Sequence, residues 1–215
     1  MYKKKPFFIV FEGVEGCGKS FQSLKLKNNL KKKRIDSILT REPGGTKEAE
    51  SIRTLILKDY FNKKKVEKFD KYTDTLLYLA ARNEHIKNKI KPALKKKKIV
   101  ICDRFIDSTI AYQVYGKKVN RSFIDNIHKV ILQGAKPDIT FILKVSTKSS
   151  KLRLKKRKTK NRYDNFQQSF YTKAQKSFLK IAKNKKNYFV FDSSLNDNNL
   201  EKKIFNIVGR YLKFK

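Results

Sequence analysis

The sequence has few of the residues that divide a chain into separate parts. Its 215 residues include four prolines and eight glycines, and no Ser-, Gly- or Pro-rich stretch separates two halves. The two cysteines, Cys17 and Cys102, exclude a disulfide framework and give no metal-ligand spacing. No segment approaches the roughly 18 consecutive apolar residues of a membrane span, and the run Phe7–Phe11 is too short for the core of a signal peptide. We therefore expect a single domain over residues 1–215, with no membrane partner and a cytoplasmic location.

Acidic residues are also scarce. Only 19 aspartates and glutamates accompany 54 lysines and arginines, so the net charge at pH 7 is +35. Such an excess is typical of nucleic-acid-binding proteins, but there the basic residues are concentrated on one face. Here the lysines occur in short runs along the whole chain, at residues 3–5, 31–33, 63–65, 95–98, 155–156 and 185–186. We attribute the charge to an AT-rich coding composition and expect no specific nucleic-acid partner, only salt-sensitive adhesion that is blind to sequence.

Short β-rich runs alternate with longer helical patterns, which predicts an α/β fold with a parallel sheet. The expected strands are Phe7–Glu12, Asp36–Thr40, Ile99–Asp103, Ile139–Lys144 and Tyr188–Asp192. The expected helices are Lys19–Lys33, Lys47–Lys58, Asp74–Lys97, Arg121–Gln133, Thr147–Arg157, Asn165–Lys183 and Asn199–Leu212. Two stripes at helical spacing are interpreted as core: Leu76, Leu77, Ala80 and Ala81 in one helix, and Ile204, Ile207, Val208 and Tyr211 in another. Ligands bind at the carboxyl ends of parallel strands, so functional motifs should follow the strands.

A glycine-rich segment directly follows the first expected strand. It fits the pattern G-x-x-x-x-G-K-[ST] and consists of Gly13, Val14, Glu15, Gly16, Cys17, Gly18, Lys19 and Ser20. In this phosphate-binding loop, glycines let backbone N–H groups turn toward the phosphates of ATP, and the next helix N-terminus adds partial positive charge. We expect Lys19 to reach the β- and γ-phosphates and the Ser20 hydroxyl to bind Mg²⁺. A chance glycine-rich turn would lack the apolar strand before it and the helical stretch after it.

Charged and aromatic residues follow the next strands. Arg41 precedes a Pro-Gly-Gly turn, where its forked guanidinium could pair with a second anionic group instead of solvent. Asp103 ends the strand beside the phosphate loop, where a carboxylate can orient Mg²⁺-bound water, and Arg104 could neutralise the transferred phosphoryl group. A capping aspartate with a surface arginine is the alternative interpretation. Tyr78 and Arg82 share one helix face and could bind a base, although such a pair taken alone more often serves packing.

In order and spacing, these segments closely resemble the thymidylate kinase family. The matching segments, which span nearly the whole chain, are Phe8–Ser20, Thr40–Thr46, Leu77–Arg82, Asp103–Gln113 and Pro137–Thr140. The Arg-Glu-Pro-Gly-Gly-Thr run is the most specific of them. The resemblance implies a three-layer sandwich of the P-loop NTPase type, with a five-stranded parallel sheet, a mobile lid and a homodimeric assembly. It also implies a nucleoside monophosphate kinase that phosphorylates dTMP to dTDP with ATP and Mg²⁺, in dTTP synthesis.

The resemblance also assigns roles at the phosphate and the sugar of the acceptor. Arg41 would hold the acceptor's phosphate, and Arg104 would bridge the phosphates. Glu15 would meet the 3′-hydroxyl of the sugar, and Tyr112 would pack beneath the deoxyribose. Phe105 stands where the family usually has tyrosine or histidine, so a hydrogen bond made there is lost.

For the base, the resemblance assigns residues from two segments. Tyr78 would stack on thymine, and Arg82 would hydrogen-bond the base. Thr109 and Gln113 would lie in the segment that faces the base. Tyr78 replaces the usual phenylalanine, which keeps the ring and adds a hydroxyl that needs a partner.

The segment 153–165 resembles the lid of the family. Some members carry an arginine in the phosphate loop where this chain has Gly16, so the lid must supply the cation that stabilises charge in the transition state. We expect Arg153 and Arg157 to be the catalytic lid residues in preference to the neighbouring lysines. Asp164 would face the acceptor sugar or metal, although it is one methylene shorter than the usual glutamate. A solvated basic helix end is the alternative for any single cation here.

Other functions fit parts of the sequence. A deoxynucleoside kinase would phosphorylate a neutral 5′-hydroxyl, and Arg41 would then lack an anionic partner. A nucleic-acid-binding ATPase would use the basic charge and would form no phosphorylated acceptor. An inactive relative would have no need for Lys19, Ser20 and Arg104. Cys17 stands where alanine is common in the family, and it is either a reactive thiolate near Lys19 or a buried packing residue.

Overall fold

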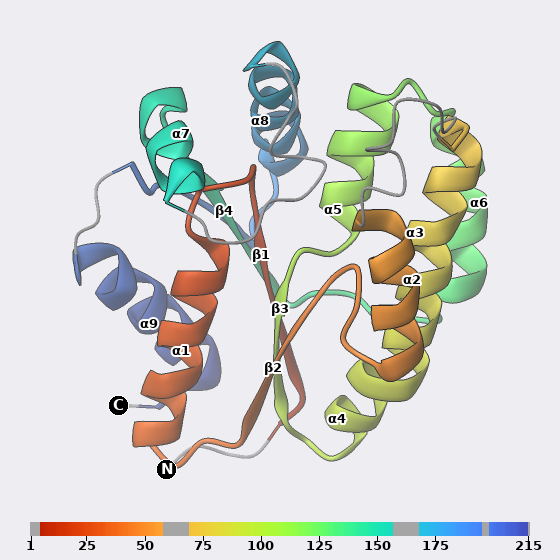
Figure 1. Ribbon diagram of the computed structural model, residues 1–215. Coiled ribbons are helices and arrows are strands. Elements are labelled where there is room, and N and C mark those ends of the chain that lie inside the picture. Colours follow the sequence, from red (N-terminus) through yellow and green to blue (C-terminus); the bar gives the residue numbers. More distant parts are fainter. Residues whose placement is uncertain (1–4, 58–68, 157–167, 195–197, 215) are drawn as a thin grey trace.

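The computed structural model describes residues 5–57, 69–156, 168–194 and 198–214. Figure 1 shows a central sheet with helices on both of its faces. The strands are β1 (Phe7–Glu12), β2 (Ser37–Arg41), β3 (Ile99–Asp103), β4 (Ile139–Lys144) and β5 (Tyr188–Asp192). All pairings are parallel, and the five strands lie in the order β2-β3-β1-β4-β5. The predicted α/β fold with a five-stranded parallel sheet is confirmed, and only β2 differs from its expected bounds, by one residue.

Helices cover the sheet as the alternating pattern predicted. They are α1 (Lys19–Lys32), α2 (Lys47–Leu57), α3 (Lys71–His85), α4 (Lys91–Lys95), α5 (Ile106–Thr109), α6 (Arg121–Ile131), α7 (Thr147–Lys155), α8 (Gln168–Ala182) and α9 (Asn198–Leu212), with π-helical segments η1 (Ile86–Ile90) and η2 (Ile110–Gly116). In Figure 1, α1 and α9 lie on one side of the sheet, and α2, α3, α4 and α6 lie on the other. None of the helices within the described ranges is long and apolar enough to cross a membrane.

Strand β1 is an unbroken apolar run because both of its faces are covered. Phe7, Ile9 and Phe11 point into the hydrophobic cluster that includes residues of α1 and α9. Phe8 and Val10 point into a second cluster, formed with η1 and α4. Successive side chains of a strand alternate between the two faces of the sheet, so a central strand needs apolar residues at every position. The phosphate loop therefore begins at a rigid, fully buried strand end.

The apolar stripe predicted as core in α3 is wrong for most of its members. Leu76 is 46% exposed, Ala80 is exposed and Leu77 is half-buried, and Ala81 alone of the four is buried. The helix instead buries several polar side chains: Asp74, Thr75, Arg82 and His85. Of these four, Arg82 lines the functional cavity described below. Asp74 pairs with Lys117, and His85 contacts Thr40 and Glu42. The stripe predicted in α9 is confirmed by its buried isoleucines and valine, Ile204, Ile207 and Val208.

The helix formed by α5 and η2 was not predicted from the sequence. Its buried face carries the polar residues Ser108, Thr109 and Gln113, which interrupt the apolar spacing that identifies a helix. The helix predicted over Asp74–Lys97 begins earlier, at Lys71, and its backbone continues from α3 through η1 into α4. The other described helix ends lie within two residues of the predicted ones. The ends predicted at Lys58, Arg157 and Asn165 lie outside the described residues.

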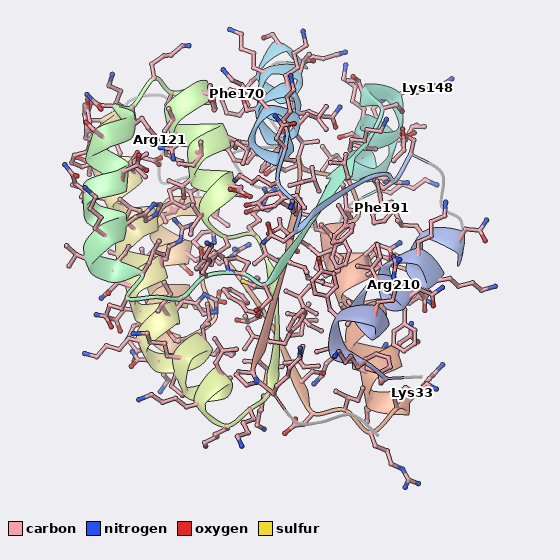
Figure 2. All side chains as sticks on the ribbon, turned by 180° about the vertical axis from the view of Figure 1, so that it is seen from behind. Lys33, Arg121, Lys148, Phe170, Phe191 and Arg210 are labelled. Carbon is pink, nitrogen blue, oxygen red and sulfur yellow. The ribbon has the colours of Figure 1, made fainter. Side chains whose placement is uncertain are left out.

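The basic charge is spread around the molecule. Figure 2 labels Lys33, Arg121, Lys148 and Arg210 at widely separated points of the ribbon. These residues belong to or border four different helices: α1, α6, α7 and α9. The distribution fits the interpretation that the charge reflects composition.

Candidate active site

The phosphate loop turns sharply between β1 and α1. Gly13, Gly16 and Gly18 have φ angles of 138°, 71° and 90°, a region that glycine adopts readily and other residues rarely do. At Gly13 a Cβ atom would also lie 2.4 Å from the carbonyl oxygen of Leu143. The Lys19 ammonium lies inside the loop, 3.0 Å from the carbonyl oxygen of Gly13. This geometry is that of a phosphate-binding loop whose cation is already enclosed by the backbone.

Ser20 and Asp103 meet beside this loop. The Ser20 hydroxyl, at the start of α1, donates to Asp103 Oδ2 at 2.5 Å, and Asp103 ends β3. The pair offers only oxygen atoms, which suits a hard cation such as Mg²⁺. Within the described ranges no group of three or more His, Cys, Asp or Glu residues could hold a metal. A magnesium ion held here would thus complete its coordination with phosphate oxygens and water, as this ion commonly does.

Glu15, Arg104 and Tyr112 form a connected group on the other side of the loop. Arg104 donates to Glu15 Oε1 at 2.8 Å, and the Tyr112 hydroxyl donates to Glu15 Oε2 at 2.7 Å. Arg104 also donates to the carbonyl oxygen of Gly13 at 2.9 Å, and its φ angle is 73°. Burial alone would raise the pKa of Glu15, but Arg104 and Lys19 lower it below its ordinary value. Glu15 is therefore an ionised carboxylate with both oxygens fixed in direction.

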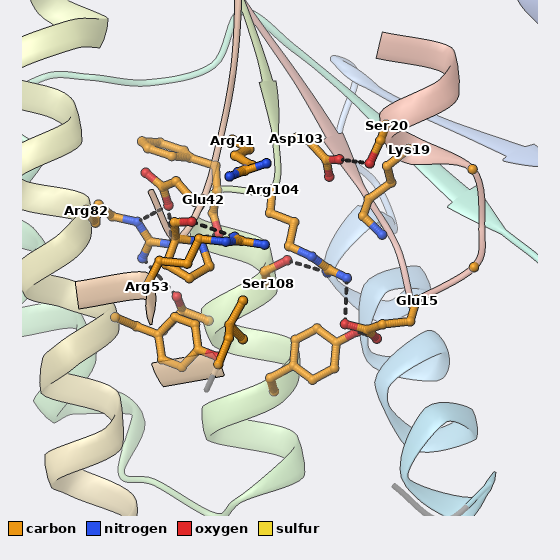
Figure 3. A pocket seen from close by; sticks show the side chains of 18 of the residues that line it. Glu15, Lys19, Ser20, Arg41, Glu42, Arg53, Arg82, Asp103, Arg104 and Ser108 are labelled. Atoms are coloured by element: carbon orange, nitrogen blue, oxygen red, sulfur yellow. Dashed lines mark hydrogen bonds and ion pairs between the residues drawn. The ribbon is translucent and has the colours of Figure 1, made fainter. Parts of the chain in front are cut away.

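Three arginines from separate segments line one cavity, which Figure 3 shows from close by. They are Arg41 at the end of β2, Arg53 on α2 and Arg104 after β3. Arg41 pairs with Glu50 at 3.0 Å, and Arg53 donates to the carbonyl oxygen of Pro43 at 2.6 Å. Burial lowers the pKa of Arg53, and the positive charges of Arg41 and Arg104 lower it further. Guanidinium groups that repel one another in this way are stabilised by an anion placed between them.

The far end of the cavity is lined by Tyr78, Arg82, Thr109 and Gln113. Arg82 is buried and pairs with Glu42, with Arg82 Nε 2.8 Å from Glu42 Oε2. Its Nη1 donates to the Thr109 hydroxyl at 2.9 Å. Gln113 is also buried, and its Nε2 has no hydrogen-bond partner among the described residues. An amide donor in this position needs a polar atom of a ligand or a water molecule.

The cavity has a volume of about 550 Å³, and it extends from the phosphate loop to α3. This volume is in the range of small-molecule sites, which is about 300–1,000 Å³. Lys19, Ser20 and Asp103 line the same cavity as the three arginines. One cavity therefore has two sets of groups that suit phosphates.

Comparisons with known proteins agree with this geometry. The family model described as "Thymidylate kinase" matches residues 11–204. The chain belongs to the thymidylate kinase family. Thymidylate kinase of Wolbachia sp. subsp. Brugia malayi is 45% identical over 179 residues, which cover 82% of each chain. Thymidylate kinase of aster yellows witches'-broom phytoplasma is 41% identical over 210 residues, which cover 96% of each chain.

A solved structure extends the likeness to three dimensions. The crystal structure of thymidylate kinase from Ehrlichia chaffeensis superimposes with a TM-score of 0.73 and 33% sequence identity. The match covers 95% of this chain and 99% of the Ehrlichia chain. The family and the fold predicted from the sequence are confirmed.

In this member of the thymidylate kinase family, two buried carboxylates that the sequence did not single out hold residues of the cavity in place, Glu12 from behind the cavity and Glu42 in its wall. Glu12 is fully buried and accepts from the backbone N–H of Phe105 at 2.8 Å and from the hydroxyl of Ser108 at 2.6 Å. Glu42 is buried between Arg82 and His85. Burial, followed by the charge of Asp107, raises the pKa of Glu12 to about 8. The sequence did not single them out because their roles depend on contacts with residues far away in the chain. Glu42 nevertheless lies in the most specific motif of the family.

The sequence analysis also did not identify Arg53 as a site residue. The sequence did contain a signal for it, because Glu50 and Arg53 stand three residues apart on one helix, directly after the Pro-Gly-Gly turn, and can pair there. The sequence alone could not show that this helix face is turned toward the cavity.

The described part of the lid ends at residue 156, so Arg157 and Asp164 lie outside the described residues. Arg153 lies on α7 and lines the cavity. Its guanidinium donates to the carbonyl oxygens of Gly16 at 3.1 Å and of Ser193 at 2.6 Å. These contacts connect the phosphate loop to the segment after β5.

Cys17 is completely buried in the phosphate loop. Burial raises the pKa of its thiol, and the nearby Lys19 ammonium, 3.6 Å from Sγ, offsets this only in part. Burial likewise raises the pKa of Cys102 well above its ordinary value. Of the two interpretations of Cys17 that the sequence left open, the geometry favours the buried packing residue.

Proposed function

We propose that this protein phosphorylates dTMP to dTDP with ATP, a step of dTTP synthesis, and that the cavity binds both nucleotides. The activity is that of the family to which the chain belongs. The observation that carries the assignment of the site is the presence of two cationic sets in one cavity: Lys19 in the phosphate loop, and Arg41, Arg53 and Arg104 opposite it. A kinase that transfers a phosphoryl group onto a phosphate needs cations for both the donor and the acceptor, whereas a kinase of a neutral 5′-hydroxyl would give the second set no substrate phosphate to bind.

The donor lies along the phosphate loop in this proposal. Backbone N–H groups from residues 13–20 and the Lys19 ammonium bind the phosphates of ATP. Ser20 and Asp103 would hold Mg²⁺, which when bound would offset negative charge on the phosphates. Arg153 lies beside the loop, and Arg157 supplies a lid cation as the chemistry requires.

The acceptor lies between the arginines and α3. Arg41 and Arg53 hold its phosphate, and Arg104 bridges the acceptor phosphate and the transferred phosphoryl group. A phosphate oxygen of dTMP attacks the γ-phosphorus, and the bond to the β-phosphate oxygen breaks, so dTDP and ADP form. Because little covalent chemistry falls to the protein, its contribution is positioning and charge stabilisation.

Recognition of the deoxyribose and the base follows from the remaining lining residues. Glu15 accepts a hydrogen bond from the sugar 3′-hydroxyl, and Tyr112 packs beneath the deoxyribose. Asp164, which lies outside the described residues, is assigned to the sugar or the metal by the family resemblance alone. Tyr78 stacks on thymine, and Arg82, Thr109 and Gln113 face the polar edge of the base. Nε2 of Gln113 has no hydrogen-bond partner in the part of the chain that the structure describes, and this supports the assignment because a base carbonyl would satisfy it.

We propose further that the protein is a homodimer located in the cytoplasm. Leu76 on α3 and Val130 on the neighbouring α6 are 46% and 71% exposed, and apolar contact across a dimer would cover such side chains. The free thiols of Cys17 and Cys102 fit a reducing compartment. Sedimentation equilibrium of the Leu76→Glu variant tests the interface, since a wild-type mass would exclude Leu76 from it.

One assay distinguishes the candidate functions. ADP release and acceptor diphosphate are measured with dTMP, dUMP, thymidine and the common ribonucleoside monophosphates. We expect dTDP from dTMP and no product from thymidine. Turnover of thymidine would indicate the deoxynucleoside kinase, and ATP hydrolysis stimulated by DNA or RNA without dTDP would indicate the nucleic-acid-dependent ATPase. Titration of Mg²⁺ in the same assay tests the metal.

A further inference from the structure

The sequence contains only two histidines, and both are buried beside the same ion pair. His85 on α3 has Nδ1 3.1 Å from Glu42 Oε1, and His128 on α6 has Nε2 2.8 Å from Arg82 Nη1. Neither histidine belongs to the described residues that line the cavity, whereas Glu42 and Arg82 do. The two imidazoles therefore stand behind the side chains that face the nucleotide, in the order His85, Glu42, Arg82, His128.

The contact between His128 and Arg82 determines which ring nitrogen carries the proton. A guanidinium only donates hydrogen bonds, so Nε2 of His128 must be the acceptor and cannot carry hydrogen. Burial, followed by the positive charge of Arg82, lowers the pKa of His128 to about 3. His128 is thus a neutral imidazole with its hydrogen on Nδ1.

The N–H groups of Arg82 are all directed by named partners. Nε and Nη2 both contact Glu42 Oε2 at 2.8 Å, and Nη2 also donates to the carbonyl oxygen of Phe105 at 2.9 Å. Nη1 divides its two hydrogens between the Thr109 hydroxyl and His128. Thr109 lines the cavity and His128 lies behind it, so one hydrogen of Nη1 is on the nucleotide side and the other is on the protein side. Figure 3 shows the guanidinium of Arg82 held against Glu42 at the wall of the cavity.

We propose that His128 is a positioning residue for the thymine base, which it serves by holding the guanidinium of Arg82. This role of His128 rests on the proposed function, in which Arg82 faces the base. One hydrogen of Nη1 stays bonded to His128, which fixes the plane of the guanidinium. When dTMP binds, the other hydrogen of Nη1 changes its acceptor from the Thr109 hydroxyl to a base carbonyl. Without His128 a buried donor would lose its acceptor, and Arg82 would turn away from the base to recover one.

Kinetics with two substitutions test the role. His128→Phe keeps a planar ring, somewhat larger than imidazole, and removes the acceptor. His128→Gln keeps an acceptor oxygen at a similar reach. We expect His128→Phe to raise the KM for dTMP about tenfold, the effect of losing one hydrogen bond to a charged group, with the KM for ATP within about twofold of wild type. His128→Gln should restore most of the dTMP affinity. Ile124→Val, a buried apolar change on the same helix, is the control for packing and should leave both KM values unchanged.

Equal dTMP KM values for wild type and His128→Phe, or equal losses in the Phe and Gln variants, would overturn the proposal. These results differ from a failure of the proposed function, in which the wild-type protein itself would form no dTDP.

NMR of the wild-type protein provides a second test that needs no variant. Because the chain has two histidines, a ¹H–¹⁵N spectrum of the imidazoles contains two ring systems. We expect the His128 ring to be neutral, with hydrogen on Nδ1, both alone and with dTMP. Saturating dTMP should shift its Nε2 resonance, because the donor is shared with a new partner. Hydrogen on Nε2, or a His128 resonance indifferent to dTMP, would overturn the proposal.

Discussion

Phe170 stacks on Tyr112, with ring centroids 5.7 Å apart and an angle of 30° between the planes. Phe170 belongs to the first turn of α8, and Tyr112 belongs to η2. Since the Tyr112 hydroxyl donates to Glu15, the stacked pair connects α8 to the phosphate loop. Gly116 leaves room for the pair, because a Cβ atom there would lie 2.9 Å from Phe170 Cε2.

Removal of this ring should weaken acceptor binding. We expect Phe170→Leu to raise the KM for dTMP about two- to tenfold, the range for one aromatic pair, while the KM for ATP stays unchanged. Phe170→Tyr keeps the ring and should remain close to wild type. Steady-state kinetics with each substrate varied give the two KM values. An equal rise of the KM for dTMP in both variants would show that stacking is not the cause.

The arginines that line the cavity opposite the phosphate loop predict a selective loss of acceptor affinity when they are replaced. Arg41→Ala and Arg53→Ala should each raise the KM for dTMP and lower kcat, with ATP binding nearly unchanged, since their partner is a phosphate that ATP does not supply. The cost of each lost charge-assisted contact is on the order of 2–4 kcal/mol. Arg210→Ala, an exposed arginine on α9, is the matched control for net charge. Wild-type acceptor kinetics in Arg53→Ala would remove Arg53 from the site.

For the lid, Arg157→Ala should lower kcat far more than either KM. The contact is expected to matter chiefly once charge develops in the transition state, and a loss of roughly a hundredfold or more is typical of such donors. Lys155→Ala is the matched control on the same segment. If Lys155→Ala lowered kcat strongly and Arg157→Ala left it unchanged, the role would belong to Lys155.

Glu12 predicts a pH dependence of stability. Its pKa rises from 4.5 to about 8 on folding, so between these values the folded protein holds a proton that the unfolded chain has lost. The contribution of Glu12 to the free energy of unfolding is therefore fully present below pH 4.5, and it falls by up to about 1.4 kcal/mol per pH unit as the pH rises to 8. Urea unfolding at several pH values should show a shallower decline for Glu12→Gln than for wild type. Parallel curves for the two proteins would contradict this role.

The two cysteines should react slowly with an alkylating reagent. Both thiols are fully buried, and burial raises the pKa of each, so little thiolate is present at neutral pH. Peptide mass spectrometry with and without Mg-ATP gives the modification rate at each position. Rapid modification of Cys17 that Mg-ATP prevents would instead establish the reactive thiolate.

The sequence by itself determined the features that depend on neighbours along the chain. A central strand such as β1 must be apolar throughout, and a phosphate loop needs glycines at fixed positions between Gly13 and Gly18, so both could be located from residue order. Arg41 and Arg104 could be located because they directly follow strand ends. These features and the family resemblance predicted the sheet, the phosphate loop and much of the cavity lining.

Tertiary packing alone decided which helix faces are turned inward. Most of the apolar stripe predicted in α3 is not buried because the helix turns Arg82 and His85 into the protein, and this burial is tolerated only since distant partners satisfy each polar atom. Glu12 and His128 acquired their positions in the same way, from residues 96 and 46 positions away in the chain. Polar side chains at helical spacing look solvent-exposed in a sequence, because nothing local distinguishes an exposed group from one whose partner comes from another element.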